Sequence, residues 1–304
     1  MHSNSAAPPA PGAFVMNRSR RSWIGTSWKM NKTRAEAAAY VAELCDWMRD
    51  SELDVSAVIF PPFTALPIAS AQLASCRAPG DAPERTRGSL QLGAQNMHWQ
   101  PRGAQTGEIS AEMLLDCDVS VVEIGHYERR ENCGETDRSV SMKAASAVAA
   151  GLEPVICIGD SPDDRRYGVA AETVSRQAKI ALHGLEPEAL GSVVLAYEPG
   201  WAIGAGGTQA EAADVEAMHR VIRDAVRASH GQEAAEQIRV VCGGSVDAAN
   251  APGYARETSI DGLFVGRAAL TAAGFIEVIE QYCAALPAAD SELVGAEGDT
   301  DDRH

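Results

Sequence analysis

The sequence lacks a positive balance of charge. Its 26 lysines and arginines are outnumbered by 42 aspartates and glutamates, so the formal net charge is −16 at pH 7. A chain of this charge is repelled by phosphate backbones and anionic lipid headgroups. The balance therefore argues against a nucleic-acid or membrane-surface binder, and we expect neither as a partner. Any anionic ligand has to be held by local dipoles and single basic residues.

The sequence also lacks an apolar run of transmembrane length. Residues 1–21 are rich in Pro, Ala and Ser, and their basic residues follow the few apolar ones, which is the wrong order for a secretory signal. Residues 287–304 are acidic and show no periodicity. We predict a cytoplasmic protein in which residues 22–286 form one folded domain between two disordered tails.

A C-x-x-C motif is absent as well. The cysteines are odd in number and scattered, and they are Cys45, Cys76, Cys117, Cys133, Cys157, Cys242 and Cys283. This pattern is typical of a reducing compartment, offers no zinc signature and predicts no metal site. We expect most of these residues to be small buried hydrophobes.

What the sequence does contain is a repeated alternation of short apolar runs with longer helical patterns. The expected strands are 23–28, 55–60, 90–95, 119–125, 154–159, 192–198, 238–241 and 260–265. Strands that are apolar on both faces are typical of a buried parallel sheet. Eight such units in about 260 residues predict a single closed (β/α)8 barrel, a TIM barrel with outer helices.

Two details complete the expected fold. A doubly wound open sheet is the alternative, but no G-x-G-x-x-G follows the first strand. A polar Pro/Gly-rich stretch at residues 77–89 is an evident insertion, and one helix is expected to run from about residue 163 to residue 182.

In a barrel, the chemistry belongs on the loops that follow the strands. After the sixth strand, Glu198 ends an apolar run, and a buried carboxylate at a strand end suits a general base. A stretch follows with small residues at its ends and large ones between, as a water-excluding lid requires. An ordinary strand and loop is the alternative. The predicted lid is Pro199, Gly200, Trp201, Ala202, Ile203, Gly204, Ala205 and Gly206.

Other strand ends supply complementary groups. Lys29 follows the first strand and His126 the fourth. A lysine can bind an anion and polarise a carbonyl, and a neutral imidazole can donate to an oxygen that becomes an enediolate. A solvated lysine and a satisfied core histidine are the alternatives. Glu128 can pair with Lys29 or relay a proton, whereas Arg129 and Arg130 are expected to form a structural ion-pair cluster.

Glycine turns end the last two strands. Gly243, Gly244 and Ser245 precede a short helix, and Gly266 opens another. Backbone N–H groups at helix starts form anion sites, and barrels recurrently bind phosphate after strands seven and eight. Tight turns that glycine merely permits are the alternative.

Several motifs, in this order, resemble those of the triosephosphate isomerase family. They are WKMN (28–31), GAQTGEIS (103–110), EIGHYERRENCGETD (123–137), AYEPGWAIG (196–204), CGGSV (242–246) and DGLFVGR (261–267). The resemblance covers essentially all of residues 22–286. It implies a glycolytic and gluconeogenic isomerase that interconverts glyceraldehyde 3-phosphate and dihydroxyacetone phosphate through an enediolate.

The resemblance also implies roles for individual residues. Glu198 would be the base, His126 the electrophile and Lys29 the substrate-binding cation, while Glu128 would be a supporting acid. No cofactor is needed, since base, electrophile and lid suffice. The family is a homodimer, and the loop that would reach into the partner subunit is Gln105, Thr106, Gly107 and Glu108. The phosphate would be held by Gly204, Ser245, Gly266 and the amide of Arg267.

The sequence departs from the family pattern at several positions. Ser27 stands where the family has asparagine, Tyr127 where it has serine and Cys242 where it has tyrosine. Arg267 replaces a glycine of the last phosphate turn, and the lid tip lacks the usual lysine. Unmatched hydrogen-bond partners cost about 1–3 kcal/mol each. These changes suggest a substrate with a different outline.

One interpretation is a four-carbon substrate, for which Ser27 leaves room for an extra hydroxymethyl group. GTSWKMNK (25–32), QNMHW (95–99) and GLFVGR (262–267) resemble the branch of the family that isomerises L-erythrulose 1-phosphate to D-erythrulose 4-phosphate in erythritol catabolism. Neutral drift in an ordinary glycolytic enzyme is the alternative. A phosphate-binding barrel without catalysis is a third interpretation.

Overall fold

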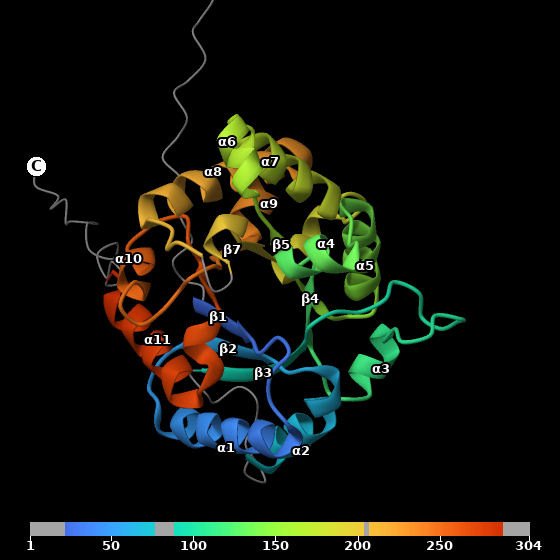
Figure 1. The fold of residues 1–304 in the computed structure, drawn as a ribbon, viewed down its shortest axis with the longest axis vertical. Coiled ribbons are helices and arrows are strands. Elements are labelled where there is room, and N and C mark those ends of the chain that lie inside the picture. Colours follow the sequence, from blue (N-terminus) through green and yellow to red (C-terminus); the bar gives the residue numbers. More distant parts are fainter. Residues whose placement is uncertain (1–21, 77–87, 204–206, 288–304) are drawn as a thin grey trace, which may run out of the picture.

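A closed barrel of parallel strands forms the centre of the molecule (Figure 1). The computed structural model describes residues 22–76, 88–203 and 207–287. Each strand pairs with the next in the sequence, and the first also pairs with the eighth, which confirms the predicted (β/α)8 barrel. The strands are β1 (Ser22–Ser27), β2 (Val55–Phe60), β3 (Ser89–Ala94), β4 (Val121–Ile124), β5 (Glu153–Ile158), β6 (Val194–Tyr197), β7 (Arg239–Cys242) and β8 (Gly262–Val265). The predicted tails and most of the predicted insertion lie outside the described residues.

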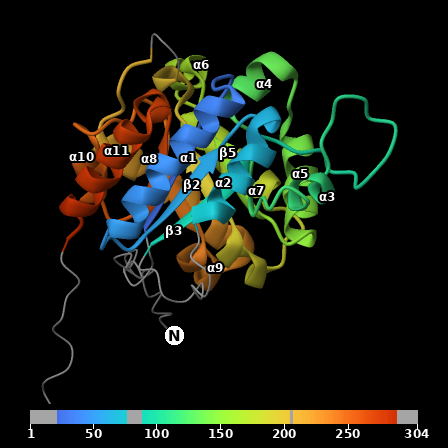
Figure 2. The same ribbon diagram turned by 90° about the horizontal axis from the view of Figure 1, so that it is seen from below.

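Helices surround the barrel (Figures 1 and 2). Thr33 and Glu36 form a reciprocal capping box at the start of α1, as their spacing indicates. No helix in the described part of the chain is long and apolar enough to cross a membrane. The helices are α1 (Arg34–Asp50), α2 (Leu66–Cys76), α3 (Ala111–Leu115), α4 (Tyr127–Cys133), α5 (Asp137–Ala149), α6 (Pro162–Tyr167), α7 (Ala170–Ala181), α8 (Ala212–His230), α9 (Gln232–Gln237), α10 (Ala251–Ala255) and α11 (Ala272–Ala285).

The interior of the barrel is packed with side chains. The rings of Trp23, Phe60 and Phe264 meet there, with the Phe60 and Phe264 centroids 5.4 Å apart. Two glycines make room for these rings: a Cβ on Gly25 would lie 2.4 Å from the Trp23 ring, and one on Gly93 would lie 2.4 Å from the Phe60 ring. Substrate chemistry is therefore confined to the ends of the barrel.

Residues of each strand alternate between this interior and the outer core beneath the helices. On β4, Val121 belongs to the inner cluster, whereas Val122 and Ile124 pack in the outer core. Glu123 lies between the two outer residues, so its side chain faces the interior.

The prediction of a single helix from about residue 163 to residue 182 is wrong. This stretch is divided into α6 and α7, because Gly168 adopts a left-handed conformation with φ 72° and caps α6. Ser161 caps the start of α6, and its hydroxyl accepts from the backbone N–H of Asp164. The short helices α4 and α9 were also not expected, since neither is long enough to show an apolar period.

The cysteine expectations were partly wrong. Cys45 of α1 and Cys76 of α2 form a disulfide with their Cα atoms 6.0 Å apart, although the pattern indicated reduced cysteines. The two residues meet because α1 and α2 pack side by side (Figures 1 and 2), which the spacing in sequence does not reveal. Of the seven, only Cys45, Cys157 and Cys242 are buried.

Candidate active site

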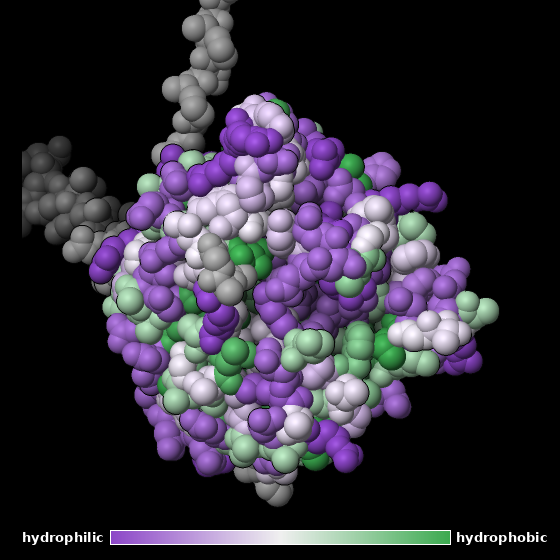
Figure 3. Space-filling view, in the orientation of Figure 1, coloured by the Kyte–Doolittle hydropathy of each residue, from purple (hydrophilic) through white to green (hydrophobic). Residues whose placement is uncertain are grey.

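Polar groups gather at the end of the barrel where the strands finish. Figures 1 and 3 look onto this end, with α4 and α6 toward the viewer, and Figure 3 shows hydrophilic residues over the middle of the face. The strands end nearly level, since Ser27 of β1 lies opposite Phe60 of β2 and Tyr197 of β6 lies opposite Cys242 of β7. Residues that follow different strands are therefore brought together.

Glu198 directly follows β6 and is buried, with 4% of its surface exposed. Its backbone N–H donates to the Ile158 carbonyl at 2.8 Å, which continues the pairing of β5 and β6. A Cβ on Gly159 would lie 1.9 Å from the Glu198 carbonyl oxygen, and one on Gly243 would lie 2.8 Å from Glu198 Cγ. Only glycine fits at these two neighbouring positions, so the packing fixes where the carboxylate stands.

His126 caps the N-terminus of α4 and faces Glu198. Its Nδ1 accepts from the backbone N–H of Glu128 at 3.1 Å, so the neutral ring carries its proton on Nε2. That Nε2 lies 3.4 Å from Glu198 Oε1. The imidazole is buried and presents a donor beside the carboxylate, which is the geometry of a general base paired with an electrophile.

Lys29 is connected to His126 through Glu128. Its Nζ donates to Glu128 Oε1 at 2.7 Å, and Glu128 Oε2 lies 3.7 Å from His126 Nδ1. The Lys29 backbone has a left-handed φ of 54°, and its carbonyl accepts from Gln95 Nε2 at 3.0 Å. The structure thus links Lys29, Glu128, His126 and Glu198 into one continuous constellation, as the sequence predicted.

The base of the predicted lid is tied down by Asp160. This buried carboxylate accepts from the Tyr197 hydroxyl at 2.7 Å and from Trp201 Nε1 at 3.2 Å. Burial, reinforced by Asp160, raises the pKa of Tyr197, which keeps the hydroxyl a donor. The Arg165 guanidinium stacks 4.0 Å from the Trp201 ring centroid. Gly204, Ala205 and Gly206, the predicted lid tip, lie outside the described residues.

The glycine turn after β7 is joined to this base. Ser245 Oγ donates to the Ala202 carbonyl at 2.8 Å, and the Ser245 carbonyl accepts from Asn250 Nδ2 at 2.8 Å. Gly244 has a left-handed φ of 105°. Gly266 follows β8 and precedes a 3-10 turn (Arg267–Leu270), in which the Arg267 side chain is exposed.

The structure shows what surrounds the residues that depart from the family pattern. Ser27 is buried at the end of β1, directly before the turn that carries Lys29. The Tyr127 ring packs on the start of the lid, where a Cβ on Gly200 would lie 2.4 Å from Tyr127 Cε2. Cys242 is fully buried, and burial raises the pKa of its thiol. Its Sγ donates to the Gly243 carbonyl at 3.4 Å.

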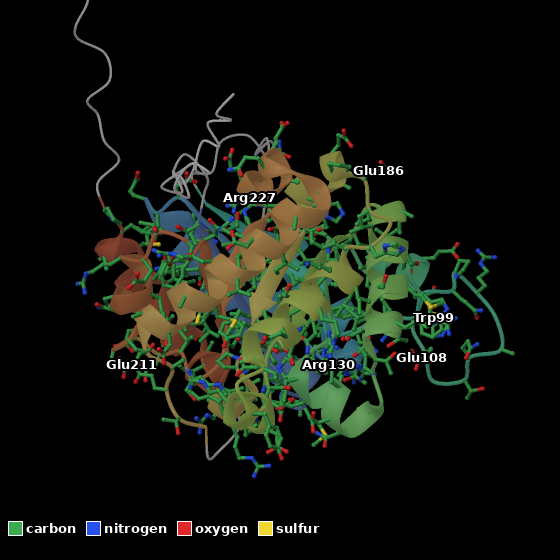
Figure 4. The ribbon with its side chains drawn as sticks, turned by 90° about the horizontal axis from the view of Figure 1, so that it is seen from above. Trp99, Glu108, Arg130, Glu186, Glu211 and Arg227 are labelled. Atoms are coloured by element: carbon green, nitrogen blue, oxygen red, sulfur yellow. A yellow bond between two sulfur atoms is a disulfide. The ribbon has the colours of Figure 1, made fainter. Side chains whose placement is uncertain are left out.

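The arginines after His126 are structural, as expected. Arg129 Nε pairs with Glu135 at 3.1 Å, and Glu135 also pairs with the buried Lys143. Arg130, labelled in Figure 4, pairs with Asp137 at 2.6 Å and donates to the Gly125 carbonyl at 2.7 Å. These contacts hold α4 in place, and α4 begins at His126 and carries Glu128.

Sequence reasoning missed one carboxylate, Glu123 of β4. It is 2% exposed. Burial raises its pKa to about 7; of its neighbours, His126 lowers this pKa, Glu198 raises it and the Ser27 hydroxyl lowers it. The signal was available, because a glutamate stands inside an otherwise apolar strand just before Gly125. The strand-end rule does not reach it, because Glu123 stands within the strand and not after its end.

A closed (β/α)8 barrel that gathers a carboxylate, an imidazole and an ammonium group at the C-terminal ends of its strands belongs to the class of TIM-barrel enzymes. The model of the family described as triosephosphate isomerase matches residues 22–282. This chain belongs to the triosephosphate isomerase family, and its activity is that of an isomerase.

Similar proteins carry two names. The chain is 40% identical to the L-erythrulose-1-phosphate isomerase of Rhizobium etli over 265 residues, which are 87% of this chain and 93% of that protein. It is 42% identical to that of Rhizobium meliloti over 267 residues, covering 87% and 98% of the two chains. It is also 42% identical to the triosephosphate isomerase of Acetivibrio thermocellus over 265 residues, covering 87% and 99%. Overall identity therefore does not separate the two activities.

Proposed function

We propose that this protein is an L-erythrulose-1-phosphate isomerase, which forms D-erythrulose 4-phosphate during erythritol catabolism. The observation that carries the proposal is Ser27, a small buried side chain beside the turn of Lys29 where the family has an asparagine. A smaller residue there favours a substrate with one more hydroxymethyl group next to the reacting carbons. The names of the two Rhizobium relatives support this choice.

The proposed reaction moves one carbon-bound proton from C3 to C2 and one hydroxyl proton from O3 to O2, and it leaves the carbon chain unchanged. The Glu198 carboxylate removes the proton from C3, the C–H electron pair forms the C2–C3 double bond, and the carbonyl electrons move onto O2. His126 Nε2–H donates to the enediolate and passes a proton between O3 and O2. Glu198 then returns its proton to C2, leaving the carbonyl at C3. The atoms balance without an oxidant, reductant or metal.

Lys29 and the two glycine turns would hold the phosphorylated end. Lys29 is held beside the reacting groups by Glu128, so its charge can both bind the substrate and polarise the carbonyl. We infer that Ser245, Gly266 and the backbone amide of Arg267 hold the phosphate. Local groups of this kind are required because the whole chain is acidic.

The second candidate is triosephosphate isomerisation, with roles in glycolysis and gluconeogenesis. It is favoured by the retained constellation of Lys29, His126 and Glu198, which serves a three-carbon substrate equally well, and by the 42% identity to the Acetivibrio thermocellus protein. The two candidates share every chemical step and differ only in the group attached to the carbon that Glu198 deprotonates.

A two-substrate assay tests the proposal. Initial rates with L-erythrulose 1-phosphate and with D-glyceraldehyde 3-phosphate give kcat/KM for each. We expect the four-carbon substrate to be preferred at least tenfold, on the order of what one added group in a fitted pocket contributes. A preference for the triose phosphate would assign the protein to the second candidate. The Glu198→Gln variant, inactive on both, is the control for a contaminating isomerase.

We further propose that the enzyme is a cytoplasmic homodimer whose domain spans residues 22–286. Residues 101–108, which include the loop at Gln105–Glu108, are all exposed and project away from the barrel (Figure 4). A long loop with few partners of its own supports insertion into a second subunit. A phosphorylated sugar does not cross membranes unaided, which supports action where sugars are phosphorylated.

A further inference from the structure

Glu123 is a buried carboxylate that the proposed mechanism does not use. Its side chain faces the barrel interior and its Oε2 has no hydrogen-bond partner among the described residues. A buried polar atom without a partner is costly, and a carboxylate more so than a neutral group. The described part of the chain places no lysine or arginine in an ion pair with it. A group that binds in the site would supply the missing partner.

The neighbours of Glu123 place it on the floor of the active site. Burial is the main cause of the raised pKa of its carboxyl, and His126, Glu198, the Ser27 hydroxyl and Lys29 all lie close enough to alter that pKa further. On β5, the pKa of the inward-facing Cys157 thiol is raised by burial and, to a smaller extent, by the nearby carboxylates of Glu198 and Glu123. Glu123 stands two residues before Gly125 on β4. Its carboxyl therefore lies on the inner wall of the barrel, below the strand ends where the reacting groups are found.

We propose that Glu123, together with Ser27, binds the hydroxyl of the substrate's extra hydroxymethyl group and so selects a four-carbon over a three-carbon phosphate. This inference rests on the proposed function and names the residues that would determine its substrate. Ser27 supplies the room and Glu123 supplies the unmatched polar atom. A triose phosphate has no hydroxymethyl group at that carbon, so it would leave the carboxyl without a partner.

The chemistry of the two groups is complementary. A sugar hydroxyl both donates and accepts, so it can donate to the ionised carboxylate or accept from the protonated acid. Because burial raises the pKa of Glu123 to about 7, both forms are present near neutral pH, and the hydroxyl can satisfy either. A site built to hydrogen-bond a hydroxyl rejects the analogue that lacks it more strongly than an apolar pocket does.

The test compares substrate preference in two variants and a control. In Glu123→Leu, which keeps the volume but removes the polar atoms, kcat/KM for L-erythrulose 1-phosphate should fall at least tenfold, while that for D-glyceraldehyde 3-phosphate stays constant or rises. Glu123→Gln keeps a donor and an acceptor and should remain within a few-fold of the wild type. Glu153→Gln is the matched control, because Glu153 is a partly buried barrel carboxylate on β5 that accepts from Trp23 Nε1 at 3.2 Å.

Equal losses on both substrates in Glu123→Leu would overturn the inference, since they would mean that Glu123 acts on Glu198 or on the fold. An unchanged ratio of the two kcat/KM values would overturn it as well. The thermal midpoint of each variant identifies losses from unfolding, and if Glu123→Leu does not fold, Glu123→Ala takes its place. The proposed function fails separately, through a wild-type preference for the triose phosphate, whereas this inference fails only through the change in ratio.

Discussion

Lys29 is held in a backbone conformation that lysine rarely adopts. A left-handed φ costs a non-glycine residue on the order of 1 kcal/mol, so its surroundings must maintain it. Gln95 does so by donating to the Lys29 carbonyl at 3.0 Å and to the Phe60 carbonyl at 2.8 Å. The strain turns the chain at the end of β1 and aims the ammonium group at Glu128, where the proposed chemistry needs it.

His219, on α8, gives the structure a pH dependence outside the active site. Burial lowers its pKa to about 4, helped by Arg223 and opposed by the hydrogen bond to the Ser259 carbonyl and by Glu216. The ring is therefore neutral when folded and must charge on unfolding in acid. Its stabilising effect is complete above pH 6.5, the unfolded pKa, and is lost as the pH falls toward 4.

We predict that His219→Gln, which can still donate to the Ser259 carbonyl, flattens this dependence. Between pH 7 and pH 4 the wild type should lose about 3 kcal/mol of unfolding free energy more than the variant, from a pKa difference of about 2.5 units. Urea unfolding at several pH values measures it. Parallel curves for the two proteins would mean that the ring is charged in the folded state.

At the scale of residues, the sequence was most informative where a polar group follows an apolar strand. Glu198, His126 and Lys29 could be predicted this way, because strand ends converge in a barrel. Glu123 was missed because the expectation for a strand interior is a core residue, although a glutamate inside an otherwise apolar strand is itself a signal. The strain at Lys29 and the support from Gln95 depend on contacts between elements that no local pattern encodes.

Among the elements, α4 is packed closely against the base of the lid. The Tyr127 ring of α4 lies over Gly200, and a Cβ at residue 200 would meet Cε2 at 2.4 Å and the Asp160 carbonyl oxygen at 3.0 Å. The larger residue at 127 therefore demands glycine at 200, and the two positions are coupled.

A double-mutant cycle tests this coupling. Gly200→Ala should cost about 1–3 kcal/mol of unfolding free energy through overpacking. In the Tyr127→Ser background, which removes the ring, the same substitution should cost about 1 kcal/mol less, the remainder arising from the Asp160 carbonyl. Urea unfolding of the four proteins measures the cycle. Strictly additive effects on the free energy of unfolding would show that the Tyr127 ring moves aside without an energetic penalty.

At the scale of elements, the strands and the long helices were predictable from apolar runs and periodicity. The spacing of Thr33 and Glu36 is that of a capping box, and α1 begins there. The break between α6 and α7 was missed, because a lone glycine in a helical pattern is often tolerated and Gly168 here adopts a left-handed cap. The disulfide between Cys45 and Cys76 depends on helix packing, which spacing does not reveal.

For the whole molecule, the projecting loop predicts a dimer. Figure 4 shows Glu108 on this loop and Glu186 on another side of the barrel, and both are exposed. Sedimentation should give twice the chain mass of 32.1 kDa for the wild type. Glu108→Arg should weaken the dimer and lower activity at dilute concentration, whereas Glu186→Arg, the same change of charge elsewhere, should not. A wild type that sediments as a monomer would contradict this.

The overall fold was the most predictable level, because eight repeats of one unit leave few alternatives. The identity of the substrate was the least predictable, since one buried serine and one buried glutamate distinguish the candidates. The chemistry common to both candidates is the central claim, and it requires that a proton, and not a hydride, leaves the substrate.

Isomerisation in deuterium oxide tests this claim most directly. With L-erythrulose 1-phosphate as substrate, we predict deuterium at the carbon that Glu198 reprotonates, seen by NMR and mass spectrometry, and none above background in Glu198→Gln. The same label should appear, more slowly, with the triose phosphate. Turnover that leaves both the product and the recovered substrate free of deuterium would contradict proton transfer through an enediolate, and with it the role given to Glu198.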